Sequence, residues 1–372
     1  MADFKKLMSD NNGFRIPQYE IRIGKGPSLS GLSKLDPKSF PALSITVNQS
    51  IGPASSAQIA FICPYNASKS EFVDGVYDEL EPGQMIDIKM GYKSPESVFV
   101  GIVASINTSF TPSGVVIGVT CYDAKMALFH NIHWKQHERD NPTIKGVVTK
   151  VLAPCLKYGK IDVVGTKYDA EMEKGQVTSM FQDNVDDYRY IMRLAALTNS
   201  SFFARAGTVY FTENLLDKAK AEVKLGWGKG LMNFSVDIDI SGQIGSVEIA
   251  YRTGGRKEEI VTYEGEDVKG KGELASESAN VVEKKVVEIT DVHATNDKQA
   301  KITAKNKFLQ SAMNYVIGRG STIGLPEIEA GTAIDLTGLG KKLNGEYFLT
   351  QVTHQFDAGG FLTNFTCQKA KI

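Results

Sequence analysis

The sequence lacks the features that mark several large classes of protein. Its 372 residues include only four cysteines, and no two of them form a Cys-x-x-Cys pair, so we expect neither a disulfide scaffold nor a zinc ribbon. No apolar run approaches the length that crosses a bilayer, and the opening MADFKKLMSDNNGF has no apolar stretch behind its lysines. We therefore expect reduced thiols, synthesis in a cytoplasm, no signal peptide and no membrane anchor.

An excess of charge of either sign is also missing. The chain carries 42 basic and 43 acidic residues, a net charge of -1, so it has no global basic field and we expect no sequence-specific binding of nucleic acid. Its 42% hydrophobic and 23% charged residues are ordinary for a globular protein, and its length suggests two or three domains. Partners must be recognised by shape and local contacts.

An internal repeat is the most informative feature that is present. LEPGQMIDI at 80–88 matches IEAGTAIDL at 328–336, and residues 106–125 match residues 352–371 without a gap. A third match pairs SAQIAF at 56–61 with SVEIAY at 246–251. The principal repeat positions are Gly83, Asp87, Phe110 and Gly114 in the first copy, and Gly331, Asp335, Phe356 and Gly360 in the second.

The repeated segments alternate apolar and polar residues, as half-buried strands do, and glycines stand between them where hairpin turns need positive φ. We predict a mainly β protein with an α+β insertion: two similar tube-like antiparallel β-barrels in tandem, with a mixed helical domain between them. Strands at 19–23, 43–47 and 58–63 complete the first barrel. The predicted domains are 1–128, 129–230 and 231–372.

Four segments outside the repeat have helical or irregular patterns. Residues 143–159 and 184–200 place apolar side chains on one helical face, the first with a bend at Pro154, and a third helix is predicted over 297–317. The third match joins segments that are closer together in the sequence than those of the other two matches. This difference implies that residues are inserted within the second barrel. Residues 254–298 are charged and poor in aromatic residues, so we predict an extended arm there.

The histidines of HNIHWKQHE are the best candidates for chemistry. His130, His133 and His137 would share a metal if the segment were a helix, which keeps open a metal-dependent hydrolase that acts on the cell wall. The plainer interpretation is a polar connector with solvated imidazoles. The glycine clusters lack the spacing of a phosphate loop, and no Gly-x-Ser-x-Gly elbow occurs. We therefore predict no catalytic residue, no cofactor and no metal.

The last fifty residues resemble a known family. Gly-x-Pro, Ala-Gly, Asn-Gly-x-Tyr and Val-x-His patterns are similar to the end of the phage late control protein D family, the tail baseplate hub proteins, whose fold is shared by the N-terminal part of VgrG. FVGIV at 99–103 and the segment from Asp186 to Phe211 agree with the same family. The residues that carry the resemblance are Gly324, Pro326, Ala330, Gly331, Gly345, Tyr347 and His354.

The resemblance implies a structural role without enzymatic activity. It implies a homotrimer that joins the six-fold tail tube to the three-fold central spike of a phage tail or phage-tail-like particle, in contact with tube, spike and tape measure proteins. Such a particle belongs to the contractile injection systems, is assembled in the bacterial cytoplasm, and places the chain in the virion tail. Because the chain ends at Ile372, soon after the second barrel, we expect a stand-alone hub whose spike is another gene product. A VgrG-like secretion hub without its needle is the alternative.

Overall fold

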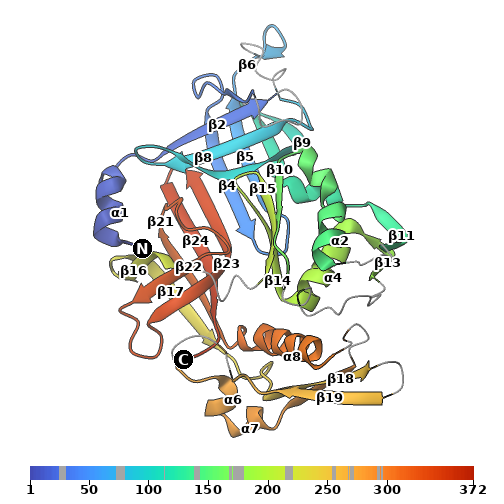
Figure 1. The fold of residues 1–372 in the computed structure, drawn as a ribbon. Coiled ribbons are helices and arrows are strands. Elements are labelled where there is room, and N and C mark those ends of the chain that lie inside the picture. Colours follow the sequence, from blue (N-terminus) through green and yellow to red (C-terminus); the bar gives the residue numbers. More distant parts are fainter. Residues whose placement is uncertain are drawn as a thin grey trace.

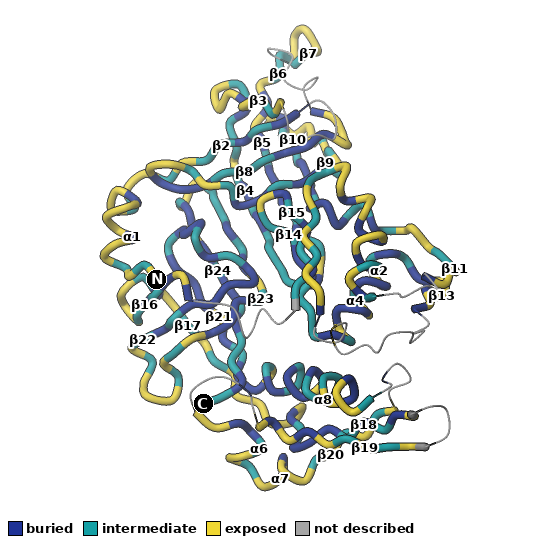
Figure 2. Tube along the Cα trace, viewed as in Figure 1, coloured by how far each residue is buried: buried dark blue, intermediate teal, exposed yellow. Residues whose placement is uncertain are grey.

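The chain folds into a mainly β structure in which two barrels are continued by smaller α+β units (Figure 1). In the computed structural model the described residues are 1–24, 31–72, 80–112, 114–137, 143–166, 170, 180–213, 221–253, 257–266, 268, 272–290, 294 and 296–372. Buried residues gather inside both barrels and beneath the helices that cover the smaller sheets (Figure 2). Within the described helices, none is long and apolar enough to span a membrane.

The first barrel is a strongly curved antiparallel sheet in the order β4-β5-β10-β9-β8-β2-β3. Inward side chains alternate with outward ones, as the sequence pattern predicted, and the predicted strands at 19–23, 43–47 and 58–63 are confirmed. Its strands are β2 (Gln18–Gly24), β3 (Ser33–Lys34), β4 (Ala42–Ser50), β5 (Ser56–Cys63), β8 (Met85–Gly91), β9 (Glu96–Thr111) and β10 (Gly114–Tyr122). A small hairpin, β6 (Tyr65–Asn66) and β7 (Glu71–Phe72), extends from one end.

The second barrel is closed, because its strands pair in a complete circle, β16-β17-β21-β24-β23-β22 and back to β16. Its strands are β16 (Ala221–Trp227), β17 (Gly230–Ile238), β21 (Val316–Ile323), β22 (Ala333–Thr337), β23 (Gly345–Asp357) and β24 (Gly360–Lys369). The N-terminal β1 (Ala2–Asp3) pairs with β16, and α1 (Phe4–Asp10) and η1 (Asn12–Phe14) lead from there to the first barrel. β16 begins before the boundary predicted at residue 230, so that boundary was placed too late.

Matching hydrogen bonds and bulges relate the two barrels, although among the described strands only the second is closed and its β16 pairs parallel to β22 where β2 pairs antiparallel to β8. The N–H of Gly83 donates to the carbonyl of Val103, and the N–H of Gly331 donates to that of Leu349, both at 2.8 Å. Gly83 and Gly331 have φ of +93° and +89°, a conformation that costs glycine little. The register of β9 against β10 shifts at Ala104, and that of β23 against β24 shifts at the equivalent Thr350. A shared bulge at one position supports duplication of a whole sheet.

The third sequence match was wrong. Residues 246–251 do not return to the barrel as the counterpart of β5; they begin β18 (Ser246–Thr253), which belongs to a separate sheet with β19 (Lys257–Tyr263) and β20 (Val286–Thr290). The counterpart of β5 is β21, since these two strands pair with β10 and β24 respectively. Short alternating strands look alike in any half-exposed sheet, so a six-residue match could not distinguish them.

The insertion into the second barrel is a folded unit rather than an extended arm. It lies between β17 and β21 and contains α6 (Ala275–Ser278), α7 (Asn280–Glu283) and α8 (Asp297–Ala312) besides its sheet. The predicted third helix is α8, which Asn296 caps by accepting from the N–H of Gln299. Tyr263 and Phe308 meet edge to face in its core. Residues 254–256, 267, 269–271, 291–293 and 295 of the predicted arm lie outside the described residues.

The domain between the barrels packs two helices against short strands. The predicted helices are α2 (Ile144–Val151), which gives way to η4 (Ala153–Lys157) at Pro154, and α4 (Asp187–Thr198). Thr143 and Asp186 cap them. The other elements are η3 (Ala124–Leu128), β11 (Ile132–His137), β12 (Lys160–Val163), β13 (Met180–Asp186), β14 (Ser200–Arg205) and β15 (Thr208–Glu213).

Candidate functional site: the junction of the barrels

The two barrels are joined by a backbone ladder. β23 leaves β22 after Phe348 and pairs instead with β4 of the first barrel, from Gln351 opposite Ser50 to Phe356 opposite Ile45. The two barrels therefore share one continuous sheet, which runs through the centre of Figure 1. The β23–β24 hairpin also delivers its tip to the first barrel: the rings of Phe356 and Tyr19 lie 5.0 Å apart. Backbone pairing and apolar packing together fix the two barrels relative to each other.

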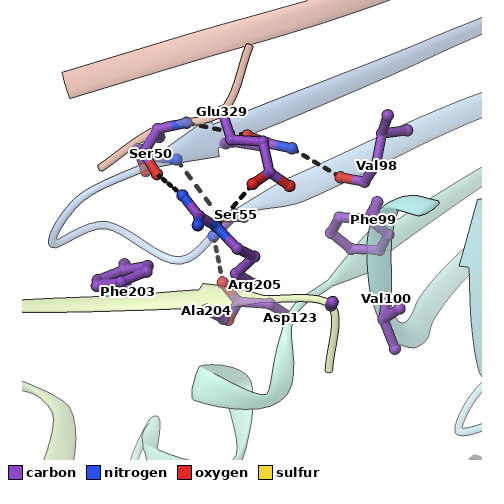
Figure 3. A pocket seen from close by; sticks show the side chains of 13 residues that line it. Ser50, Ser55, Val98, Phe99, Val100, Asp123, Phe203, Ala204, Arg205 and Glu329 are labelled. Carbon is purple, nitrogen blue, oxygen red and sulfur yellow. Dashed lines mark hydrogen bonds and ion pairs between the residues drawn. The ribbon is translucent and has the colours of Figure 1, made fainter. Parts of the chain in front are cut away.

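A small polar cluster closes the junction beside this ladder (Figure 3). Arg205 from the inserted domain places its Nε 2.8 Å from Oε2 of Glu329, and donates to the carbonyl of Ala330 at 3.3 Å. Gln49 of β4 donates to the carbonyl of Val98 and accepts from the N–H of Ala330. Burial raises the pKa of Glu329, and Arg205 opposes that rise. The cavity between these groups has about 20 Å³, room for a single water molecule, so it is a packed seam and no substrate cleft.

A buried lysine holds the inserted domain against the first barrel. The ammonium of Lys125 donates to the carbonyl of Pro53 at 2.7 Å and lies 3.5 Å from Oδ2 of Asp123. Lys125 is fully buried, and its Nζ lies 5.2 Å from the ring centroid of Phe202 in the inserted domain. Burial lowers the pKa of Lys125, and Asp123 opposes that change. The amine is thus held by contacts from both units.

The residues that carry the family resemblance are backbone and packing positions. Gly324 lies against the ring of Phe361, which would meet a Cβ at 2.0 Å. Gly345 has φ of +129° at the start of β23, and the Tyr347 hydroxyl donates to the carbonyl of Leu343 at 2.6 Å. Pro326 and Ala330 are buried in the turns before β22. These contacts explain why such residues suit the fold, and none of them suggests chemistry.

The repeat positions occupy matching places in the two barrels. Asp87 of β8 accepts from the hydroxyl of Ser97, whereas Asp335 of β22 pairs with Lys224 at 2.9 Å. Gly114 and Gly360 both have positive φ at the turns that precede β10 and β24. Phe110 is 61% exposed at the end of β9, whereas its counterpart Phe356 is packed against the first barrel. The two copies therefore differ in what covers the hairpin between their last two strands.

His354 lies inside the shared sheet. Its imidazole is fully buried opposite Val47, with Nδ1 at 3.0 Å from the Thr363 hydroxyl. Burial lowers the pKa of His354 from 6.5 to about 4, although the backbone of Ile328 opposes this shift. The histidine is therefore neutral near pH 7 and serves the packing of the junction.

Acid should weaken the fold through His354. Between about pH 6.5 and pH 4 the unfolded chain binds a proton that the native chain does not, so stability decreases as the pH falls through this window. We expect His354 to account for a loss of about 2 kcal/mol between pH 7 and pH 5. Urea denaturation at both pH values should show a smaller loss in His354→Gln, whereas His130→Gln, at an exposed position, should behave as the wild type. Equal losses in all three proteins would contradict the assignment.

The histidine cluster does not converge. Residues 132–137 form β11, so His133 and His137 are about 13 Å apart along a strand, and His130 precedes it. His137 is buried, donates from Nε2 to the amide oxygen of Gln182 at 3.0 Å and stacks on Tyr190, while His133 lies 3.7 Å from Asp187. Over the described ranges, no group of three His, Cys, Asp or Glu side chains could hold a metal ion. The helix on which the hydrolase alternative depended is absent from this segment.

Sequence reasoning missed the residues that lock the junction. Lys125 appeared only as one identity of the repeat, and Arg205, Gln49 and Asp123 carried no signal. Their role depends on side chains from three separate units meeting at one seam, and no local pattern encodes such a meeting.

Two similar barrels, joined through one sheet and carrying an inserted α+β domain, define a tail hub-like fold. The family model described as the Alg8 N-terminal domain matches residues 33–358, so the chain belongs to that family. No curated protein matches the sequence.

Solved structures with this fold come from phage tails and a secretion system. A 43 kDa tail protein of prophage MuSo2 from Shewanella oneidensis is 15% identical, with a TM-score of 0.64 over 94% of this chain and 98% of that one. A tail protein from Neisseria meningitidis is 10% identical, with a TM-score of 0.65 over 94% and 96%. A component of the Escherichia coli type VI secretion system is 12% identical, with a TM-score of 0.50 over 88% and 73%.

Proposed function

We propose that this protein is the structural hub of a phage tail or phage-tail-like particle, of the late control protein D type. Its place would be between the six-fold tail tube and the three-fold central spike, and it would act by assembly without catalysing a reaction. The observation that carries the proposal is the pair of similar barrels joined through one sheet. The similarity of the whole chain to tail proteins supports it.

A homotrimer would let this chain meet both symmetries. Three copies of a chain with two similar barrels present six similar barrel surfaces, which suit a six-fold tube. The inserted units occur once per chain, so the same trimer presents three copies of each to a three-fold spike. Tube, spike and tape measure proteins are the partners that this role requires, and the assembled particle would be the site where the protein resides.

The experiment is assembly with the tail tube protein and the spike protein of the same particle. We expect particles of the mass of three hub chains, and electron microscopy should show a three-fold ring with a central hole at one end of each tube. A chain that stays monomeric with both partners present, and leaves tube ends bare, would contradict the proposal.

A secretion hub is the second candidate, because the fold also matches a component of a type VI secretion system. In that case the chain would join a secretion tube to a needle encoded separately. Binding to secretion tube and needle proteins in preference to phage-type partners would favour this candidate, and the reverse preference would favour a phage tail.

A further inference from the structure

Among the described residues, the duplication leaves one long strand edge in each barrel without a backbone partner. In β9, residues Ser105–Phe110 pair with β10 alone among the described residues, although the equivalent part of β23, Gln351–Phe356, pairs on both sides. In β17, residues Asn233–Ile238 pair with β21 alone in the described chain. An exposed edge of this length is a template for another strand.

These two edges are the counterparts of the two strands that join the barrels. Cys121 and Cys367 are matched repeat positions, and from each of them the strand pairing can be followed across the sheet. In the first barrel Cys121 lies opposite Ala57, which lies opposite Val47 of β4. In the second barrel Cys367 lies opposite Gly318, which lies opposite Val236 of β17, so Val236 is the counterpart of Val47. The edge of β17 therefore corresponds to the edge of β4, which binds β23. The edge of β9 corresponds to the edge of β23, which binds β4.

Apolar side chains are more exposed on the two free edges than on the two strands that join the barrels. Val352 and Val47, on the joined strands, are 1% and 0% exposed. Their counterparts Ile106 and Val236 are only half-buried, and Ile238 and Phe110 are 49% and 61% exposed. The apolar side chains of the free edges thus lack the cover that their counterparts receive from each other.

We propose that β9 of one copy of this chain pairs with β17 of a second copy, in the register by which β23 pairs with β4 within the chain. Transferring that register places Phe110 opposite Phe234, Ser109 opposite Ser235, Asn107 opposite Asp237 and Ile106 opposite Ile238. The pairing reproduces a polar contact as well: Thr353 donates to Asn48 inside the chain, and the Asn107 amide would donate to the carboxylate of Asp237.

An open groove beside β17 is the place that the incoming hairpin tip would occupy. Within the chain, the tip of the β23–β24 hairpin lies beside the first residues of β4 and packs Phe356 on Tyr19. The corresponding start of β17 borders a groove of about 490 Å³. Its lining includes Phe4, Trp227, Leu231, Met232 and Ile323. At the incoming β9–β10 hairpin of the neighbouring copy, Phe110 packs against Tyr65 and Phe72 of the β6–β7 hairpin.

The contact joins different surfaces of the two copies, so it propagates head to tail, and in the proposed trimer a rotation of one third of a turn between copies closes it into a ring. In such a ring, contacts within chains alternate with equivalent contacts between chains. The inference rests on the self-assembly in the proposed function, and it names the strands, the register and the groove through which that assembly would occur. It needs no tube or spike to be tested.

Cysteine pairs test the register directly. Ser109→Cys and Ser235→Cys replace exposed serines by residues of nearly the same size, and the four native cysteines are buried. Mild oxidation of a mixture of the two single variants should give a covalent dimer, and the double variant should give a covalently closed ring. Asn107→Cys mixed with Ser235→Cys is two residues out of register, beyond the reach of a disulfide, and should give little product.

A charge placed on the edge tests the same contact without cysteines. Ile238→Lys should reduce the assembled species in mass photometry at least tenfold, whereas Ile62→Lys, at an exposed isoleucine of β5, should leave it unchanged. Absence of the Ser109–Ser235 disulfide, or assembly that survives Ile238→Lys, would overturn the inference. If rings form on tube ends without this disulfide, only the interface is wrong; if the disulfide forms and tube ends stay bare, only the hub role is wrong.

Discussion

Replacing Lys125 by alanine should lower the free energy of unfolding by about 3–5 kcal/mol. The substitution leaves the Asp123 carboxylate buried without its cationic partner, and it removes the donor to the carbonyls of Gly52 and Pro53. It also opens a gap against Phe202, so the inserted domain and the first barrel lose a contact that both share. Urea denaturation followed by circular dichroism measures the loss.

Two further variants separate charge from packing at this position. Lys125→Met combined with Asp123→Asn should recover part of the loss, since it restores volume and leaves no unpaired charge. Lys93→Ala, at an exposed lysine of the first barrel, should change stability by no more than about 0.5 kcal/mol. A Lys125→Ala protein within 1 kcal/mol of the wild type would show that solvent reaches the amine.

Phe361→Ala should be about as damaging, with a loss of about 3–5 kcal/mol. Phe361 belongs to β24 of the second barrel and is 4% exposed, yet it packs in the core of the first barrel. Its ring lies 6.0 Å from that of Tyr92 and covers Gly324. Its removal would leave a cavity where the two barrels meet, and backbone pairing on either side would keep the gap from collapsing.

The matched control for this variant is Leu362→Ala, one residue further along the same strand. Leu362 is 38% exposed and points to the other face, so its truncation should cost much less than that of Phe361. Thermal and urea unfolding of the two variants should differ clearly. Equal losses would mean that strand β24, and no specific contact of Phe361, sets the stability of the junction.

The barrels could be predicted from the sequence because their signals are local and occur twice. Alternation marks each strand, and glycines such as Gly83 and Gly331 mark turns whose φ only glycine tolerates well. Helices α2, α4 and α8 could likewise be predicted from their apolar faces and capping residues. Because the same weak strand signals occur twice in the same order, they predicted two similar barrels.

The junction and the insertion could not be predicted in this way. Pairing of β23 with β4 joins residues about 300 positions apart, and the burial of Lys125 depends on two units that meet only in the folded chain. The charged segment after Thr253 suggested an arm because acidic residues such as Glu258 lie exposed on β19, while α8 packs against this sheet. His133 and His137 were placed four apart on a helix, although a strand has the same spacing in sequence and a different one in space.

The ladder between β23 and β4 has a consequence for synthesis on the ribosome. The first barrel leaves the ribosome long before residues 345–357 exist, so the edge of β4 stays uncovered through most of translation. During that interval the β9 edge of one nascent chain matches the β4 edge of a neighbour on the same messenger. Premature pairing of this kind would trap two incomplete chains, as exposed edges do in other multidomain proteins. Slow initiation or a bound chaperone would therefore raise the yield of assembled protein.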